Sequence, residues 1–187
     1  MAGATVRQST PADVAGIQRI ARRGWEVAYG EFLAEATVEH AMAEWYASET
    51  VHEQIVDGGV AHFVACGTGD VPEQSSGKQR DPRAVENGEV VGYVGGGIPT
   101  VDDPERGAVW TFYVDPDRWN EGIGTRLFER ELDALVERGA TRVTIRVLAA
   151  NTVGRSFYES QGFEAIERDE DDLFGETRAA VMYAREI

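Results

Sequence analysis

The sequence predicts a mixed α/β fold of the α+β type, in which helices flank a central sheet without a repeating βαβ order. Three observations predict it: apolar residues at helical spacing in several segments, short apolar runs typical of strands between them, and a size sufficient for a core. The chain has 187 residues, of which 42% are hydrophobic. We therefore expect a single domain that spans 1–187.

The N-terminal part of the chain predicts two helical regions. Thr10 and Pro11 have the pattern of an N-cap followed by proline in the first turn, and apolar residues then recur at helical spacing from Val14 to Ile20. A second helical region covers 35–56, and we expect it to be broken. The chain is thus expected to start with helices.

The remainder of the chain is dominated by strand patterns. We expect six strands, at 60–66, 89–97, 109–114, 141–148, 163–168 and 177–185, and two further helices, at 122–138 and 152–161. Residues 67–88 are rich in glycine, proline, serine and charge and have no apolar periodicity. They predict a flexible insertion within a hairpin, not a domain boundary.

The charge balance is strongly acidic. The net charge is −15, the isoelectric point is about 4.6, and Lys78 is the only lysine. Two explanations remain open: a surface adapted to high salt, in which ions screen the repulsion, or a GC-rich genome that favours arginine over lysine. On either explanation the sequence offers no basic stripe to neutralise phosphates, so nucleic acid is not expected as a partner.

The composition also predicts a cytoplasmic protein. No apolar run approaches the roughly 20 residues that a membrane helix needs, and residues 1–13 lack the basic and apolar regions of a signal peptide. Cys66 is the only cysteine, as is common in a reducing compartment. His40, His52 and His62 have no ligand spacing, so we expect no metal site.

A glycine-containing loop between a strand and a helix predicts an anion site. The strand pattern at 109–114 is followed by a short loop, and Gly122, Ile123 and Gly124 then open a helix whose free N–H groups favour a phosphorylated ligand. Leu127 stands where a dinucleotide fingerprint needs a third glycine, and no lysine is near, as a P-loop requires. The alternative is a tight strand-to-helix connection without a ligand.

A second group of residues lies on the helix at 152–161. Asn151 and Tyr158 are seven positions apart, two helical turns, and therefore share nearly one face. An asparagine amide can hold a ligand carbonyl, and a tyrosine hydroxyl can donate a proton further along that face. The structural alternatives stay open: Asn151 as an N-cap, Tyr158 as a core residue and Gly162 as a C-cap.

These two motifs together resemble the GNAT superfamily of acyl-CoA-dependent N-acyltransferases. The resemblance rests on VDPDRWNEGIGTRLF at 114–128 and AANTVGRSFYESQGF at 149–163, and it covers 109–166. It implies a mostly antiparallel central sheet of six to seven strands flanked by helices. It also implies acetyl-CoA as co-substrate, with no metal.

The resemblance assigns roles to matching positions. The CoA pyrophosphate is expected on the backbone amides of Asn120, Glu121, Gly122, Ile123, Gly124 and Thr125. The pantetheine arm is expected to pair with the backbone of Phe112, Tyr113 and Val114. Asn151 matches a residue that contacts acetyl-CoA, and Tyr158 matches the tyrosine that protonates the departing thiolate, a role that a phenol of pKa about 10 can fill.

The loop departs from the family pattern in two places. Trp119 stands where arginine or glutamine is preferred, and Asn120 stands where glycine is common. One side-chain contribution to the phosphates is therefore in question, with Arg126 or Arg155 as substitutes.

The general base also departs from the family pattern. Ala108 and Arg146 occupy the two positions where family members carry a glutamate. Asp115, Glu26 and Tyr29 remain as candidate proton acceptors, each of which is also an ordinary surface or core residue.

Three functions remain in view. The leading one is an N-acetyltransferase that transfers the acetyl group of acetyl-CoA directly to a primary amine of a small molecule or peptide. The second is a non-catalytic module that binds acyl-CoA, suggested by the missing glutamates. The third is a binder of another phosphorylated ligand, such as a nucleotide. The sequence leaves the acceptor and the oligomeric state open, a homodimer included.

Overall fold

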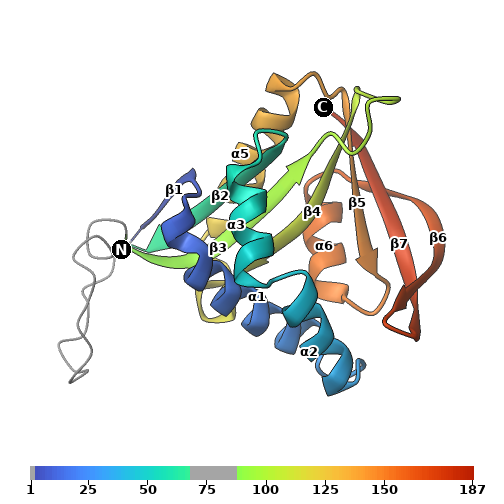
Figure 1. Cartoon of the computed structure of the whole chain (residues 1–187). Coiled ribbons are helices and arrows are strands. Elements are labelled where there is room, and N and C mark those ends of the chain that lie inside the picture. Colours follow the sequence, from blue (N-terminus) through green and yellow to red (C-terminus); the bar gives the residue numbers. More distant parts are fainter. Residues whose placement is uncertain (1–2, 68–87) are drawn as a thin grey trace, which may run out of the picture.

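The computed structural model describes residues 3–67 and 88–187. Within them, seven strands form one sheet in the order β1-β2-β3-β4-β5-β7-β6 (Figure 1). The strands are β1 Ala4–Gln8, β2 Val60–Gly67, β3 Glu89–Gly97, β4 Arg106–Val114, β5 Arg142–Leu148, β6 Glu164–Leu173 and β7 Glu176–Glu186. All neighbouring pairs are antiparallel except β4 and β5, so the predicted mixed, mostly antiparallel sheet is confirmed.

Helices cover both faces of this sheet (Figure 1). The described helices are α1 Val14–Tyr29, α2 Glu35–Glu44, α3 Ser48–Val56, α5 Ile123–Glu137 and α6 Thr152–Ser160, with short 3₁₀ turns η1 Pro11–Asp13 and η2 Pro116–Arg118. Two buried apolar clusters result, one beneath α1 to α3 and the other beneath α5 and α6. None of the described helices combines the length and the apolar character needed to cross a membrane.

The expected elements are present, with one error at the N-terminus. The chain starts with β1, an edge strand whose Thr5 pairs with Cys66 of β2, whereas we expected it to start with helices. Five residues of mixed polarity give no clear period, and the strand forms because β2 offers it a partner. The broken helical region at 35–56 is confirmed as α2 and α3. The predicted insertion at 67–88 lies, apart from its two end residues, outside the described residues.

The strand pair β4 and β5 separates halfway along its length. Pairing runs only from Arg106 opposite Arg142 to Val109 opposite Ile145. Beyond Val109, β4 continues beside β3 alone, and a register shift between Gly95 and Gly96 of β3 marks the place where it diverges. Among the described residues, no neighbouring strand therefore covers one edge of the second half of β4.

Helix α1 lies directly against the diverging part of β4. A Cβ at Gly24 would lie 2.3 Å from a ring carbon of Tyr113, so a larger residue here would push the helix away from the strand. This close packing places α1 as one wall of the space between β4 and α6.

Candidate functional site

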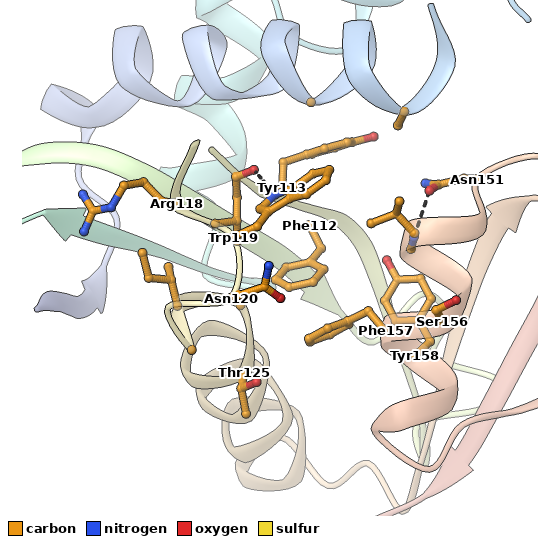
Figure 2. A pocket seen from close by; sticks show the side chains of 18 residues that line it. Phe112, Tyr113, Arg118, Trp119, Asn120, Thr125, Asn151, Ser156, Phe157 and Tyr158 are labelled. Carbon is orange, nitrogen blue, oxygen red and sulfur yellow. Dashed lines mark hydrogen bonds between the residues drawn. The ribbon is translucent and has the colours of Figure 1, made fainter. Parts of the chain in front are cut away.

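A pocket of about 430 Å³ lies where β4 separates from β5. It extends from the loop before α5, along the free edge of β4, to the beginning of α6 (Figure 2). Its lining comes from α1, β4, the loop, α5 and α6: Gly24, Ala28, Phe112, Tyr113, Val114, Arg118, Trp119, Asn120, Gly122, Ile123, Gly124, Thr125, Asn151, Val153, Gly154, Ser156, Phe157 and Tyr158. The structure thus brings together every predicted site residue except Glu121, which is exposed beside it.

The loop before α5 has the backbone of an anion site. Gly122 is the N-cap and adopts a left-handed conformation with φ of 73°, and Asn120 does so with φ of 65°. Asparagine is one of the few residues that tolerate this conformation, which explains how it replaces the family's glycine. The N–H groups of the first turn of α5 have no acceptor within the helix, and positive φ angles beside them turn the backbone into a concave nest.

The free edge of β4 presents backbone groups to the pocket. Asp115 donates its N–H to Val91 of β3, and Tyr113 lies opposite Tyr93. Because antiparallel strands alternate the direction of their polar groups, Phe112 and Val114 direct theirs away from β3 and toward the separation from β5. This is the edge to which the resemblance assigns the pantetheine arm.

Trp119 reaches back to this edge. Its indole Nε1 donates a hydrogen bond of 3.0 Å to the carbonyl oxygen of Val114, and the residue, which is 39% exposed, lines the pocket. The residue that departs from the family pattern therefore lies within the site, where it contacts the strand and not a phosphate position.

Asn151 and Tyr158 form the opposite end of the pocket (Figure 2). Asn151 is the N-cap of α6, since its Oδ1 accepts the N–H of Gly154 at 2.9 Å, and its Nδ2 donates to the Tyr29 hydroxyl at 3.2 Å. Tyr158 is 7% exposed, and burial raises the pKa of its hydroxyl well above the usual value, with Tyr29 adding to the shift. The structural alternatives are therefore confirmed, since Asn151 is an N-cap and Tyr158 is a core residue. Both residues also line the pocket.

The arginines at the site differ from those proposed as substitutes. Arg126 donates to the carbonyl oxygen of Ala4 at 2.6 Å, and Arg155 donates to the Tyr183 hydroxyl at 3.0 Å, and neither lines the pocket. Arg118 lines it instead and forms an ion pair of 2.7 Å with Glu121. Both arginines are thus engaged with other partners, and their expected role at the phosphates stays a prediction.

The candidate proton acceptors are mostly occupied or distant. Asp115 is buried and paired with Arg23 at 2.7 Å. Glu26 is exposed on α1 and does not line the pocket. Arg146, at one of the family's glutamate positions, pairs with Asp169 at 2.6 Å. The Tyr29 hydroxyl contacts a predicted site residue, since it accepts from Asn151 at 3.2 Å.

Sequence reasoning missed part of the pocket wall. Gly24 and Ala28 come from α1, and only the tertiary packing of α1 on β4 places them there. Arg118 could have been found, because it directly precedes Trp119 in the loop that carries the motif. Phe157 could also have been found, because it precedes Tyr158 and completes an aromatic wall, with its ring 5.0 Å from that of Phe112.

Comparisons with known proteins agree with this geometry. Residues 35–163 match the model of the acetyltransferase (GNAT) family. A mycothiol acetyltransferase from Beutenbergia cavernae is 36% identical over 66 residues, which are 35% of this chain and 22% of that protein. A ribosomal protein bS18-alanine N-acetyltransferase from Escherichia coli (strain K12) is 34% identical over 59 residues, which are 32% of this chain and 40% of that protein. The chain thus spans less than half the length of these curated relatives.

A solved structure shares the fold over almost its whole length. The PaiA N-acetyltransferase from Thermoplasma acidophilum, solved in complex with coenzyme A, has a TM-score of 0.75 at 18% identity, and the match covers 98% of this chain and 99% of that one. The family model covers well over half of the sequence, and the matched residues include the loop before α5. The chain therefore belongs to the acetyltransferase (GNAT) family.

Proposed function

We propose that the protein is an N-acetyltransferase that transfers the acetyl group of acetyl-CoA directly to a primary amine of a small molecule or peptide. The observation that carries the proposal is the continuity of the pocket: one cavity joins the anion-binding loop, the free edge of β4, and Tyr158. A pyrophosphate, an amide-containing arm and a thioester occur in this order along acetyl-CoA.

The described residues fit this co-substrate. The amides from Asn120 to Thr125 would hold the pyrophosphate, and the backbone groups of Phe112 and Val114 that face away from β3 would pair with the pantetheine arm, the Val114 carbonyl oxygen once the Trp119 indole releases it. Gly124, in the first turn of α5, lies against the Phe112 ring, where a Cβ would meet the nearest ring carbon at 3.4 Å. The net charge of −15 opposes binding of an anion, and the nest of backbone amides offsets it locally, whereas Arg118 is already paired with Glu121.

The chemistry of acetyl transfer needs a hydrogen-bond donor for the carbonyl oxygen and a proton donor for the sulfur, and we assign these roles to Val114 and Tyr158. Acetyl-CoA supplies the acetyl group as a thioester. The amine attacks in its neutral form, because an ammonium has no free electron pair. The N–H of Val114 is the donor that we assign to the carbonyl oxygen as it gains charge. As the C–N bond forms and the C–S bond breaks, Tyr158 gives its hydroxyl proton to the departing sulfur, and its raised pKa keeps it protonated until then. The proton that the amine nitrogen loses passes to solvent, from which the Tyr158 hydroxyl is restored.

The acceptor is open to experiment. The two curated relatives are named for different acceptors, which supports acetyl transfer in general and neither acceptor in particular.

We propose that the chain works as one domain in the cytoplasm, that a homodimer is its assembled form, and that its acidic surface suits high salt. Sedimentation tests the homodimer, unfolding in low and molar salt tests the single domain and the salt adaptation, and subcellular fractionation tests the location.

A thiol-release assay tests the central proposal. Purified protein, acetyl-CoA and a panel of primary amines are combined in low and in molar salt, and free CoA thiol is measured. Thiol release that depends on one amine class supports the enzyme. Thermal unfolding with each ligand is measured alongside. A higher unfolding temperature with acetyl-CoA but no thiol release favours a non-catalytic acyl-CoA module. Stabilisation only by nucleotides that lack pantetheine favours the third function, and no stabilisation by any of them contradicts all three.

A further inference from the structure

One hydrogen bond joins the end of α1 to Asn151, the pocket residue at the beginning of α6. Tyr29, the last residue of α1, accepts the Nδ2–H of Asn151 at 3.2 Å, although the two residues are separated by 122 positions in the chain. The sequence offers Tyr29 only as a candidate proton acceptor. Its contact with Asn151 points to a different role.

The hydrogen bonds of Asn151 determine what its side chain presents to the pocket. Its Oδ1 must face Gly154, whose N–H it accepts at 2.9 Å, so the orientation of the amide is fixed. The amide nitrogen carries two hydrogens, and Tyr29 takes one of them. Asn151 lines the pocket, so its second N–H is the group that remains for a ligand. Asn151 therefore presents a donor, which pairs with a carbonyl oxygen.

Tyr29 is held rigidly enough to fix this geometry. Its side chain is 7% exposed, and its ring packs edge-on against Trp25 at 4.8 Å and Phe32 at 5.9 Å. Burial raises the pKa of its hydroxyl, while hydrogen bonds with Asn151 and Tyr113 lower it in part. The hydroxyl thus lies between two residues of the pocket wall on a ring that cannot turn freely.

We propose that Tyr29 is a positioning residue for acetyl-CoA: by accepting one N–H of Asn151, it directs the other toward a carbonyl oxygen of the acetyl-pantetheine chain. This role rests on the proposed function. It involves no proton transfer, since Tyr29 acts through Asn151 and does not itself contact the ligand. It also explains why a residue of α1, outside both sequence motifs, belongs to the site.

A double-mutant cycle tests this role. Tyr29→Phe keeps the ring and removes the acceptor, and Asn151→Ser keeps an N-cap side chain and removes the amide donor. Each variant is expected to raise the Kd of acetyl-CoA about three- to tenfold, the effect of one lost neutral hydrogen bond. Because both changes break the same interaction, the double variant is expected to bind no more weakly than Asn151→Ser. Calorimetric titration gives Kd, and thermal unfolding confirms that each variant is folded.

Tyr46→Phe is the matched control. Tyr46 is a buried phenol of the same aromatic cluster, 6.4 Å from Trp25 between ring centres, and its hydroxyl accepts from the Trp25 indole at 3.4 Å. This variant is expected to bind acetyl-CoA as the wild type does. A wild-type Kd in Tyr29→Phe, an equal loss in Tyr46→Phe, or additive losses in the double variant would each overturn the positioning role alone. A wild-type protein that does not bind acetyl-CoA overturns the proposed function as well.

Discussion

Trp119 donates its indole N–H to the carbonyl oxygen of Val114, 3.0 Å away, on the strand edge that faces the pocket. The indole thus holds a carbonyl that the proposed function assigns to the pantetheine arm. A ligand that pairs with this edge must compete with the protein's own side chain.

We therefore expect Trp119→Phe to bind acetyl-CoA more tightly, by about two- to tenfold, because no indole hydrogen bond has to be broken first. Titration calorimetry measures the change. Trp110→Phe is the control, since Trp110 is 52% exposed and does not line the pocket. Weaker binding by Trp119→Phe would show that the indole supports the ligand instead of competing with it.

Tyr158→Phe is expected to lower kcat by about two orders of magnitude, because the departing thiolate loses its proton donor, and to change KM for acetyl-CoA little. In the wild type, the raised pKa of Tyr158 keeps the donor protonated, so its ionisation causes no loss of rate up to about pH 10. Initial rates across pH test both statements.

Tyr183→Phe provides the control for this prediction. Tyr183 is a buried tyrosine of the same core cluster, and its hydroxyl donates to Glu159 at 2.6 Å, away from the pocket lining. This variant is expected to keep its kcat. If Tyr158→Phe reacts at the wild-type rate at every pH, the acid role is wrong.

Gly122→Ala is expected to destabilise the fold by about 1–2 kcal/mol, the cost of placing a side chain in the left-handed conformation that Gly122 adopts. The corresponding fall in Tm is about 3–6 °C for a chain of this size. Gly58→Ala is the control: a Cβ there meets no atom within 4 Å, and its φ is not positive. Equal Tm values would contradict the prediction, whereas partial rescue by Gly122→Asn would support it.

Glu131 is expected to make stability depend on pH. It is fully buried on α5, and within the described residues neither carboxylate oxygen has a hydrogen-bond partner. Burial raises its pKa from 4.5 to about 8, so the folded state keeps a proton that the unfolded state releases above pH 4.5. Stability is therefore lost as pH rises toward 8, by up to roughly 1.4 kcal/mol per pH unit.

Glu131→Gln is expected to abolish this loss, because the amide imitates the protonated acid. The stabilities of the variant and the wild type are compared above pH 6.5, where His62 does not contribute. Burial lowers the pKa of His62 to about 4, so this histidine reduces stability only as the pH falls below its unfolded pKa of 6.5. Urea unfolding from pH 6.5 to 8.5 measures the effect. Glu129→Gln, an exposed position on the same helix, should keep the wild-type pH dependence. If the free energy of unfolding becomes equally independent of pH in both variants, Glu131 is not the source of the pH dependence.

The sequence predicted the part of the site that lies within continuous motifs. The strand, loop and helix around Gly122 and the helix with Asn151 and Tyr158 are local patterns, in which turn conformation, capping and helical spacing determine the geometry. These residues do meet in one pocket. Their binding and catalytic roles remain predictions.

The parts that could not be predicted depend on distant contacts. β1 has too few residues for a period and forms only against β2. Tyr29 reaches Asn151 because α1 packs closely on β4, which no local pattern reveals. The orientation of Arg126 and Arg155 likewise follows from partners elsewhere in the chain, Ala4 and Tyr183.

The short pairing between β4 and β5 also has a consequence for how the protein folds. Strands β1 to β4 come from the N-terminal part of the chain, and β5, β7 and β6 come from the C-terminal part. The two groups meet across four residue pairs, so the weakest line of the sheet coincides with a division of the sequence. The N-terminal group can therefore form its own strand pairs before the C-terminal group is synthesised. Joining the two groups would then be a late event of folding, and it is this event that creates the pocket.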